Sequence, residues 1–266
     1  MSDIIAGQVT AFFLYEAAEI IDLARVAGLV GPTAQARLST KATAPSYVQY
    51  RQPPLTIDGE ALGLSETLGF RVRFKIFDYG VISIALTRPL PESWGELIER
   101  AIAWQDDQRL AAAAESLCRN LMDRVHAAMT APRTELVTED YVVFSVTGLA
   151  GTPTSTGLLD AHGDDIARLL RGERERLSGQ EREDVLRHRL SYLECDLLVP
   201  TWNAAFVYDT ESGVHAALEI LEFANSQLLE FRYYDQHLDR ELAALVTSLH
   251  RRKGDAFSCV PEFTNM

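Results

Sequence analysis

The amino-acid sequence predicts an α+β fold, with mixed or antiparallel sheets, flanking helices and one long C-terminal helix. Residues 70–77 alternate between apolar and basic side chains, and Asp78-Tyr79-Gly80 leads into a second apolar run at 81–86. This period of two, broken by a turn, predicts a β-hairpin. Residues 214–250 place apolar side chains at a helical period instead. The strands and helices expected between these regions do not alternate regularly, which favours α+β over a βαβ fold.

The remaining elements follow from shorter patterns. Aromatic and β-branched runs predict strands at 9–15, 141–146, 192–199 and 204–208, with one more near 47–50. Helices are expected at 20–30, 93–131, 165–171 and 178–189, the second of them interrupted near Asp106-Asp107. Residues 31–66 and 148–157 are rich in turn-forming residues and are expected to be mainly loop. Because 141–146 is apolar almost throughout, we expect that strand to be covered on both faces.

A chain of 266 residues has room for one large domain or two small ones. We expect an N-terminal α+β half containing the 70–86 hairpin, a second α/β half, the long helix, and a disordered or atypical tail. These parts span residues 1–135, 136–212, 213–254 and 255–266.

The charge and the cysteines restrict the classes of function. A formal net charge of −13 disfavours non-specific binding to nucleic acid and to anionic lipid. The first residues lack the basic start and apolar run of a signal peptide, and no uncharged apolar stretch of about 18 residues occurs. Cys118, Cys195 and Cys259 lie far apart, as expected of reduced thiols. Together these features favour a cytoplasmic protein.

The long helix carries a seven-residue repeat. Ten of eleven positions at heptad spacing are apolar, and Asp235 is the exception. The first series is Val214, Leu221, Leu228, Asp235, Leu242 and Leu249, and the second is Ala217, Ala224, Phe231, Leu238 and Leu245. A repeat of seven favours a left-handed supercoil with a partner helix. A carboxylate buried at Asp235 would need a partner such as an arginine.

The length of this helix decides between two interpretations. An apolar stripe often does no more than pack on the protein's own core. At 1.5 Å per residue, however, 214–250 spans about 55 Å, more than the diameter of a small domain. We therefore expect a non-enzymatic interaction or scaffold protein that forms a homo-oligomer, or docks a partner helix, through this surface.

Four segments carry a resemblance to a known family. They are FKIFDYGVISIAL (74–86), EDYVVFSV (139–146), LSYLECDLLVPTWNAAFVYD (190–209) and LEILEFANSQLLEFRYYDQHLDREL (218–242). In this order they resemble the required-for-meiotic-nuclear-division family, in its uncharacterised bacterial branch. The resemblance extends over most of residues 9–250.

The resemblance implies little about chemistry. Members are mostly of unknown activity, no catalytic residue is established among them, and they typically end in helices followed by a hydrophobic membrane-anchoring segment. Mitochondrial relatives sit at the inner membrane and are linked to organelle translation. Here the sequence after Gly254 reads DAFSCVPEFTNM and has no apolar span. We expect either a soluble variant or an altered end, with a membrane role only if a downstream segment has been lost.

Two alternative functions remain open. A small-molecule-binding protein or enzyme would use a cleft near Trp202, Asn203 and Asn225, with Tyr233 and Tyr234 covering it and Asp235 nearby. An RNA-associated protein would use the basic strand face of Arg71, Arg73 and Lys75, which is expected to face water and to bind in a salt-sensitive manner. The interpretation of this face as an ordinary salt-bridged surface is preferred, because no stacking aromatics share it.

No catalytic residue, metal ligand or cofactor is assigned. His162-Gly163-Asp164-Asp165 is expected to be a loop whose acids cap the following helix. Asp184 and His188, and likewise Asp235, His237 and Asp239, lack further converging ligands. The glycines of 148–157 lack the Lys-Ser/Thr of a phosphate-binding loop, and no nucleophile motif occurs.

Overall fold

The computed structural model describes residues 4–30, 52–64, 66–105 and 107–257, with side chains as far as residue 247. Its centre is a single mixed sheet in the order β3-β5-β6-β1-β8-β10-β9, with β4 also paired to β5. The sheet strands are β1 (Ile4–Glu16), β3 (Leu55–Asp58), β4 (Glu66–Thr67), β5 (Phe70–Ile76), β6 (Val81–Pro89), β8 (Val137–Leu149), β9 (Leu197–Pro200) and β10 (Ala204–Tyr208). All pair antiparallel except β8 and β10, which run parallel. The expected α+β class is confirmed.

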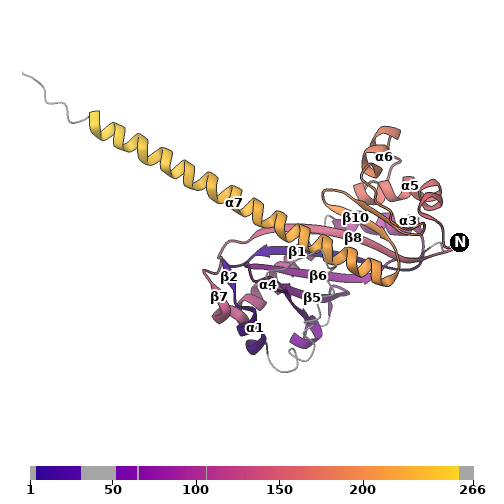
Figure 1. Cartoon of the computed structure of the whole chain (residues 1–266), viewed down its shortest axis with the longest axis horizontal. Coiled ribbons are helices and arrows are strands. Elements are labelled where there is room, and N and C mark those ends of the chain that lie inside the picture. The colour runs from indigo at the N-terminus through magenta and orange to yellow at the C-terminus, as the bar shows by residue number, and fades with distance from the viewer. Residues whose placement is uncertain (1–3, 31–51, 65, 106, 258–266) are drawn as a thin grey trace, which may run out of the picture.

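Helices cover both faces of this sheet (Figure 1). The helices are α1 (Leu23–Leu29), α3 (Trp94–Gln105), α4 (Gln108–Val125), α5 (Ser155–Arg171), α6 (Gly179–Leu186) and α7 (Glu211–Phe257). Short 3-10 turns occur at Gly59–Leu62 and His126–Ala128, and β2 (Ile20–Ile21) pairs with β7 (Met129–Thr130). Helices α3, α4 and α5 pack on one face, and α7 crosses the other before it leaves the body.

Strand β8 joins the two expected halves into one sheet. It pairs with β1 from the first half and with β10 from the second. The expected boundary at residues 135 and 136 therefore lies between β7 and β8, and strands from both sides of it are hydrogen-bonded neighbours. Residues 141–146 are all buried, which confirms that this strand is covered on both faces.

The hairpin at 70–86 is confirmed, but the expected orientation of its basic face is wrong. Strands β5 and β6 pair antiparallel from Arg71 and Thr87 to Ile76 and Ile82. Arg71 is exposed, whereas Arg73 is half-buried and Lys75 is only 2% exposed. The cause is α7, which covers this face of the sheet and places two glutamates over it. A period of two identifies the faces of a strand but not what lies on them.

The helix expected at 93–131 is interrupted where predicted. Ser93 caps α3 by accepting a hydrogen bond from the Glu96 backbone N–H (3.3 Å). The Asp107 side chain accepts from the Arg109 backbone N–H (2.9 Å) at the start of α4.

Helix α5 begins ten residues earlier than the expected 165, with Thr154 as its cap. The loop expected at 148–157 is correspondingly short. Gly157 and Gly163 weaken the helical pattern in the sequence, but Leu158, Ile166 and Leu170 are buried against the core and stabilise the helix.

Two other expectations need adjustment. Helix α1 begins at Leu23, after β2, and not at residue 20. Strand β9 begins at Leu197, because Asp196 accepts hydrogen bonds from the backbone N–H groups of Tyr192 and Leu193 and holds the preceding residues in a loop. The strand expected near 47–50 lies outside the described residues. The helix expected at 178–189 is α6, capped by Ser178.

Candidate association helix

Helix α7 packs on the sheet through its first half. Val214, Leu218, Leu221 and Leu229 are buried. They belong to an apolar cluster with Phe12 and Leu14 of β1, Tyr141 and Val143 of β8, and Ala205 and Val207 of β10. This cluster is separate from the core on the other side of the sheet, so α7 alone supplies the cover of this face among the described residues.

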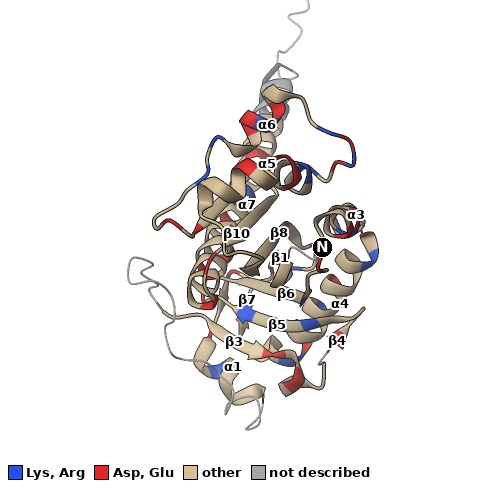
Figure 2. Ribbon diagram, turned by 90° about the vertical axis from the view of Figure 1, so that its right-hand side faces the viewer, with Lys and Arg blue, Asp and Glu red and all other residues tan. Residues whose placement is uncertain are grey.

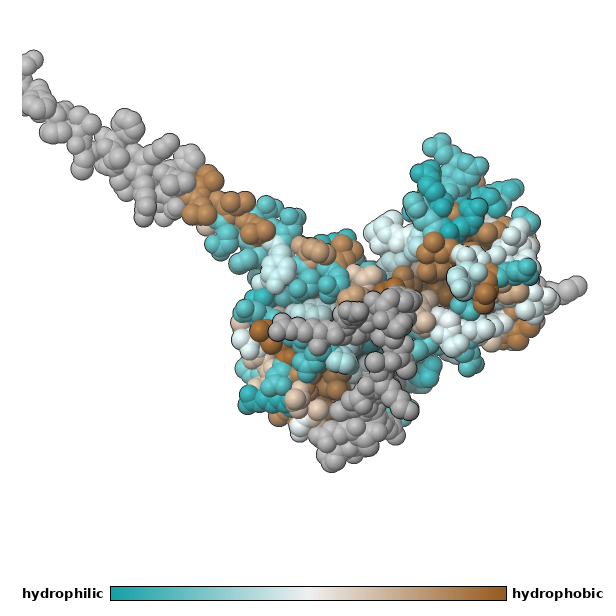
Figure 3. Space-filling model, viewed as in Figure 1, coloured by the Kyte–Doolittle hydropathy of each residue, from teal (hydrophilic) through white to brown (hydrophobic). Residues whose placement is uncertain are grey.

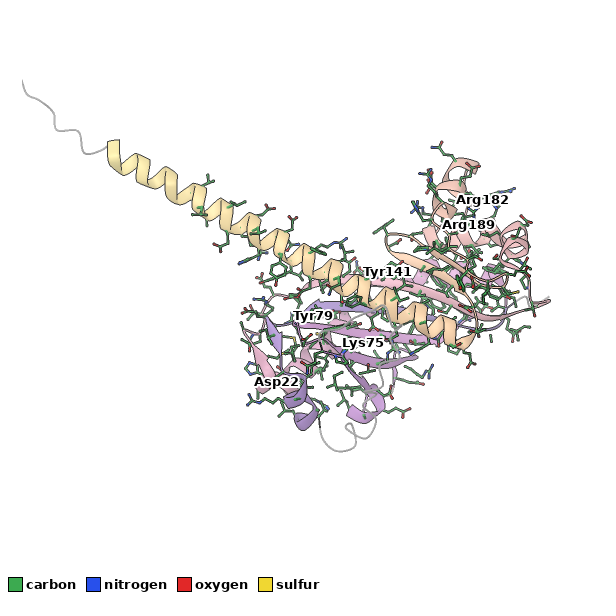
Figure 4. All side chains as sticks on the ribbon, in the orientation of Figure 1. Asp22, Lys75, Tyr79, Tyr141, Arg182 and Arg189 are labelled. Atoms are coloured by element: carbon green, nitrogen blue, oxygen red, sulfur yellow. The ribbon has the colours of Figure 1, made fainter. Side chains whose placement is uncertain are left out.

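A buried ion cluster connects the same part of α7 to strand β5. The Lys75 Nζ lies 2.5 Å from Glu222 Oε2 and 2.8 Å from Glu219 Oε1, and Arg73 Nη2 lies 3.5 Å from Glu222 Oε2. Burial alone would raise the pKa of Glu222, but the charges of Lys75 and Arg73 and the hydrogen bond from Lys75 hold it below its usual range. Figure 4 shows Lys75 and Tyr79 on the side of the sheet that α7 crosses. The Tyr79 hydroxyl lies 2.6 Å from Ser226 Oγ and adds a second polar link.

A second cluster lies where α7 leaves the sheet. Arg232 pairs with Glu139 of β8, and the Arg133 guanidinium lies 4.5 Å from the centre of the Tyr233 ring. Glu16, at the end of β1, is 2% exposed, and its Oε1 lies 3.7 Å from Arg133 Nη2. Burial, reinforced by Glu230, raises the pKa of Glu16 to about 8, and burial also raises the pKa of Glu230.

Beyond this point α7 projects away from the body (Figure 1), and its apolar side chains remain on the surface (Figure 3). Phe231 is 73% exposed, Leu238 59%, Leu242 58% and Leu245 56%. We call the heptad positions from Leu228 to Leu242 the free seam; it comprises Leu228, Phe231, Asp235, Leu238 and Leu242. Leu249 continues this spacing in the sequence, but its side chain lies outside the described residues.

The seam and the sheet-facing surface of α7 diverge because they follow different periods. The buried positions Val214, Leu218, Leu221, Asn225 and Leu229 follow the 3.6-residue turn of the helix. A strict repeat of seven rotates around a straight helix by about 20° per heptad. The two patterns coincide at Val214 and Leu221, but Ala224 is already exposed and Leu228 is 37% exposed. The sheet of the same chain therefore covers only the first residues of the heptad pattern.

The residues of the expected cleft do not form one hollow. Trp202 is 73% exposed in the turn between β9 and β10, and Tyr234 is 54% exposed on α7. Asn203 uses its backbone carbonyl to accept from Val142 N–H. Asn225 is buried and donates to the Leu221 carbonyl of its own helix (2.8 Å). Each of the two asparagines thus has a local structural role.

A large hollow lies elsewhere, on the side of the sheet that α4 covers. A groove of about 630 Å³ runs between α4 and the sheet and is lined by Phe12, Phe13, Tyr15, Trp104, Asp107, Gln108, Ala111, Ala112, Glu115, Thr138, Glu139, Asp140 and Val142. Three of its carboxylates already pair with arginines: Asp107 with Arg109, Glu115 with Arg119, and Glu139 with Arg232. None of the expected cleft residues lines this groove or the smaller hollows along β5, α7 and residues 190–198.

The basic strand face offers little to a nucleic acid. Lys75 and Arg73 are engaged by Glu219 and Glu222, which leaves Arg71 as the exposed cation of the three. Elsewhere, charged residues of both signs lie on α5, on α6 and between them (Figure 2), and several of them form ion pairs with one another.

His162, Asp164 and Asp165 lie within α5 and not in the expected loop, so the interpretation of these acids as helix caps is wrong. Asp164 pairs with Arg176 and with Arg182, which joins α5 to the segment around α6. The His162 ring stacks on Trp94, with 4.7 Å between ring centres, and its Nδ1 lies 3.1 Å from Asp165. Asp184 pairs with Arg187. Within the described residues no group of three or more His, Cys, Asp or Glu side chains is arranged to hold a metal ion.

The sequence interpretation missed the residues that fasten α7 to the body. Glu219 and Glu222 stand three apart on the helix face that also carries Leu218 and Leu221, and a pair of acids there signals buried cations opposite. Lys75 gave no matching signal, because its alternation with Phe74 and Ile76 places it on the face that was expected to meet water. Glu16 and Glu230 left no comparable signal, because nothing in the sequence pairs the end of β1 with that turn of α7.

No helix among the described residues is both long enough and apolar enough to cross a membrane.

Comparison with known proteins assigns the body of the molecule to a protein family. Residues 6–215 match the family model described as uncharacterized protein MJ0711, N-terminal domain, and the chain belongs to this family. No curated protein and no solved structure shows significant similarity to the chain. The match establishes membership of an uncharacterised family and does not name the required-for-meiotic-nuclear-division family. It ends near the start of α7, so the projecting part lies beyond the matched region.

Proposed function

We propose that this chain is a non-enzymatic assembly protein that self-associates through the free seam of α7. The observation that carries the proposal is that Phe231, Leu238 and Leu242 each expose more than half of their side chains at heptad spacing on a helix that projects from the body. An apolar stripe of this kind is normally covered in a stable protein.

The projecting part of α7 needs a partner for its own stability. Residues 231–257 form a helix of about 40 Å at 1.5 Å per residue. Most helical stability in proteins comes from packing of an apolar face, and isolated helices are marginal in water. A second helix laid along the free seam would supply that packing.

The partner that fits best is another copy of α7. A heptad stripe is self-complementary, because side chains at its two series of positions insert between those of an identical helix. Burying a half-exposed Leu or Phe contributes on the order of 1 kcal/mol. The seams of two chains together contribute about 8 kcal/mol, against an association cost of about 4–15 kcal/mol. We therefore expect a dimer that dissociates on dilution.

Size-exclusion chromatography with light scattering tests this proposal with a matched pair of variants. Leu238→Glu with Leu242→Glu places two charges in the free seam, and we expect it to reduce the measured mass to that of one chain. Gln236→Glu with Ala243→Glu adds the same charge at exposed positions outside the seam and should keep the wild-type mass. A wild-type chain that stays monomeric at high concentration contradicts the proposal.

We further propose a kinship between this chain and the bacterial branch of the required-for-meiotic-nuclear-division family, supported by the order of the four segments between residues 74 and 242. A solved member of that family with the strand order β3-β5-β6-β1-β8-β10-β9 would support it, and a different order would contradict it. A cytoplasmic location is proposed on the acidic composition and the three separated cysteines. Fractionation of cells into soluble and membrane material tests that location.

A further inference from the structure

We infer that the two copies of α7 pair antiparallel, so that the two bodies lie at opposite ends of the helix pair. This inference rests on the proposed self-association and specifies its geometry. Three features support it: the position of Asp235, the charge of the bodies, and the direction of the helix dipoles.

Asp235 occupies the single polar position of the free seam. It is exposed, and no ion pair of Asp235 occurs among the described residues. In a parallel pair in register, each heptad position meets its own counterpart, and the two Asp235 carboxylates would lie side by side in the apolar seam. Like charges brought together out of water are strongly unfavourable. In an antiparallel pair the first heptad series faces the second, so that Asp235 lies opposite a different residue and the two carboxylates separate.

The bodies favour the same orientation. Each chain carries a formal net charge of −13. A parallel pair would hold both bodies at the same end of the seam, where their charges repel. An antiparallel pair separates them by the length of residues 231–257, about 40 Å, which is several times the screening length of about 8 Å at physiological salt.

The helix dipoles favour the same orientation. In an antiparallel pair the dipoles of the two helices point in opposite directions, which favours that arrangement.

Pulsed electron–electron distance measurement distinguishes the two orientations. The label is attached at Ala224→Cys, an exposed position where α7 still lies on the body. Cys195 and Cys259 are replaced by serine, and Cys118 is buried. If residues 231–257 of two chains overlap antiparallel, the labels are about 60 Å apart along the helix axis, since 40 residues separate them at 1.5 Å each.

The outcomes separate this inference from the proposed function on which it rests. A dimeric mass with a distance clearly above about 25 Å, and near 60 Å if residues 231–257 overlap fully, supports the antiparallel pair. A dimeric mass with a distance below about 25 Å, as expected for labels side by side in a parallel pair of helices 8–10 Å apart, overturns the orientation and leaves self-association intact. A monomeric mass overturns the proposed function itself. Small-angle scattering of the unlabelled dimer provides a check, because two bodies at opposite ends give two separate peaks in the distance distribution.

Discussion

The Nζ of Lys75 lies 2.5 Å from Oε2 of Glu222, and both side chains are buried between strand β5 and helix α7. This contact fixes the rotation of α7 on the sheet. By doing so it determines which side of the helix is covered by the chain's own core and which side carries the free seam.

Replacing Lys75 with methionine should destabilise the protein by about 3–5 kcal/mol, because it leaves two buried glutamates without their main cation. Urea unfolding measures the change. Arg71→Met, on the same strand face but exposed, is the matched control and should change stability by less than about 0.5 kcal/mol.

Adding Glu222→Met to Lys75→Met should recover part of the lost stability, since apolar side chains of similar size replace buried ions with little cost. If the double variant is less stable than Lys75→Met alone, the ion pair does not have the role assigned to it.

The carboxyl pair of Glu16 and Glu230 predicts a loss of stability at alkaline pH. Burial, followed by the effect of Glu230, raises the pKa of Glu16 from 4.5 to about 8. A group with a raised pKa in the folded state contributes stability that is full below about pH 4.5 and is lost as the pH rises through about 8. Glu222 does not oppose this trend, because its lowered pKa affects stability only at acidic pH. Thermal unfolding between pH 6 and 9 should therefore show a falling midpoint.

Glu16→Gln removes the titrating group and keeps the shape, so the midpoint of this variant should vary less over the same range. Equal slopes for the variant and the wild type would show that the pair does not control the pH dependence.

Asp235→Leu should strengthen self-association. The substitution removes the only charge from the free seam and extends its apolar series, so we expect the dissociation constant to fall by about tenfold or more, equivalent to at least about 1.4 kcal/mol. Sedimentation equilibrium measures it. Gln236→Leu adds a leucine next to the seam but outside it and should have a much smaller effect; equal effects would contradict the heptad assignment.

The sequence predicts the structure well where the pattern of one helix or strand depends only on its own residues. The 70–86 hairpin and the break before α4 are local, and both follow from periodicity and caps. The position of Lys75 is not local: it looks solvent-facing in its strand and is buried because α7, more than a hundred residues later, brings Glu219 and Glu222 over it. The start of α5 could likewise not be predicted from the sequence. Two glycines weaken its helical pattern, and the burial of its apolar side chains against the core compensates for their low helix propensity.

The heptad repeat shows what a local pattern can predict and what it cannot. It identified a helix longer than the body, and the structure has that helix. The repeat did not reveal at which residue the free seam separates from the sheet-facing surface of α7. That point depends on the rotation of α7 on the sheet, which the contact between Lys75 and Glu222 fixes. The cleft expected near Trp202 stays a prediction: Trp202 is 73% exposed and Asn225 is buried, and neither lines any of the four hollows described above.

Hydrogen exchange of the full-length wild-type chain tests the central claim most directly. If the free seam is an interface between copies, the backbone amides of residues 231–247 should exchange slowly at high protein concentration and faster on dilution. Those of residues 214–229, covered by the chain's own sheet, should be protected at both concentrations. Fast exchange of 231–247 at every concentration, or protection that does not change with dilution, would contradict an association through α7.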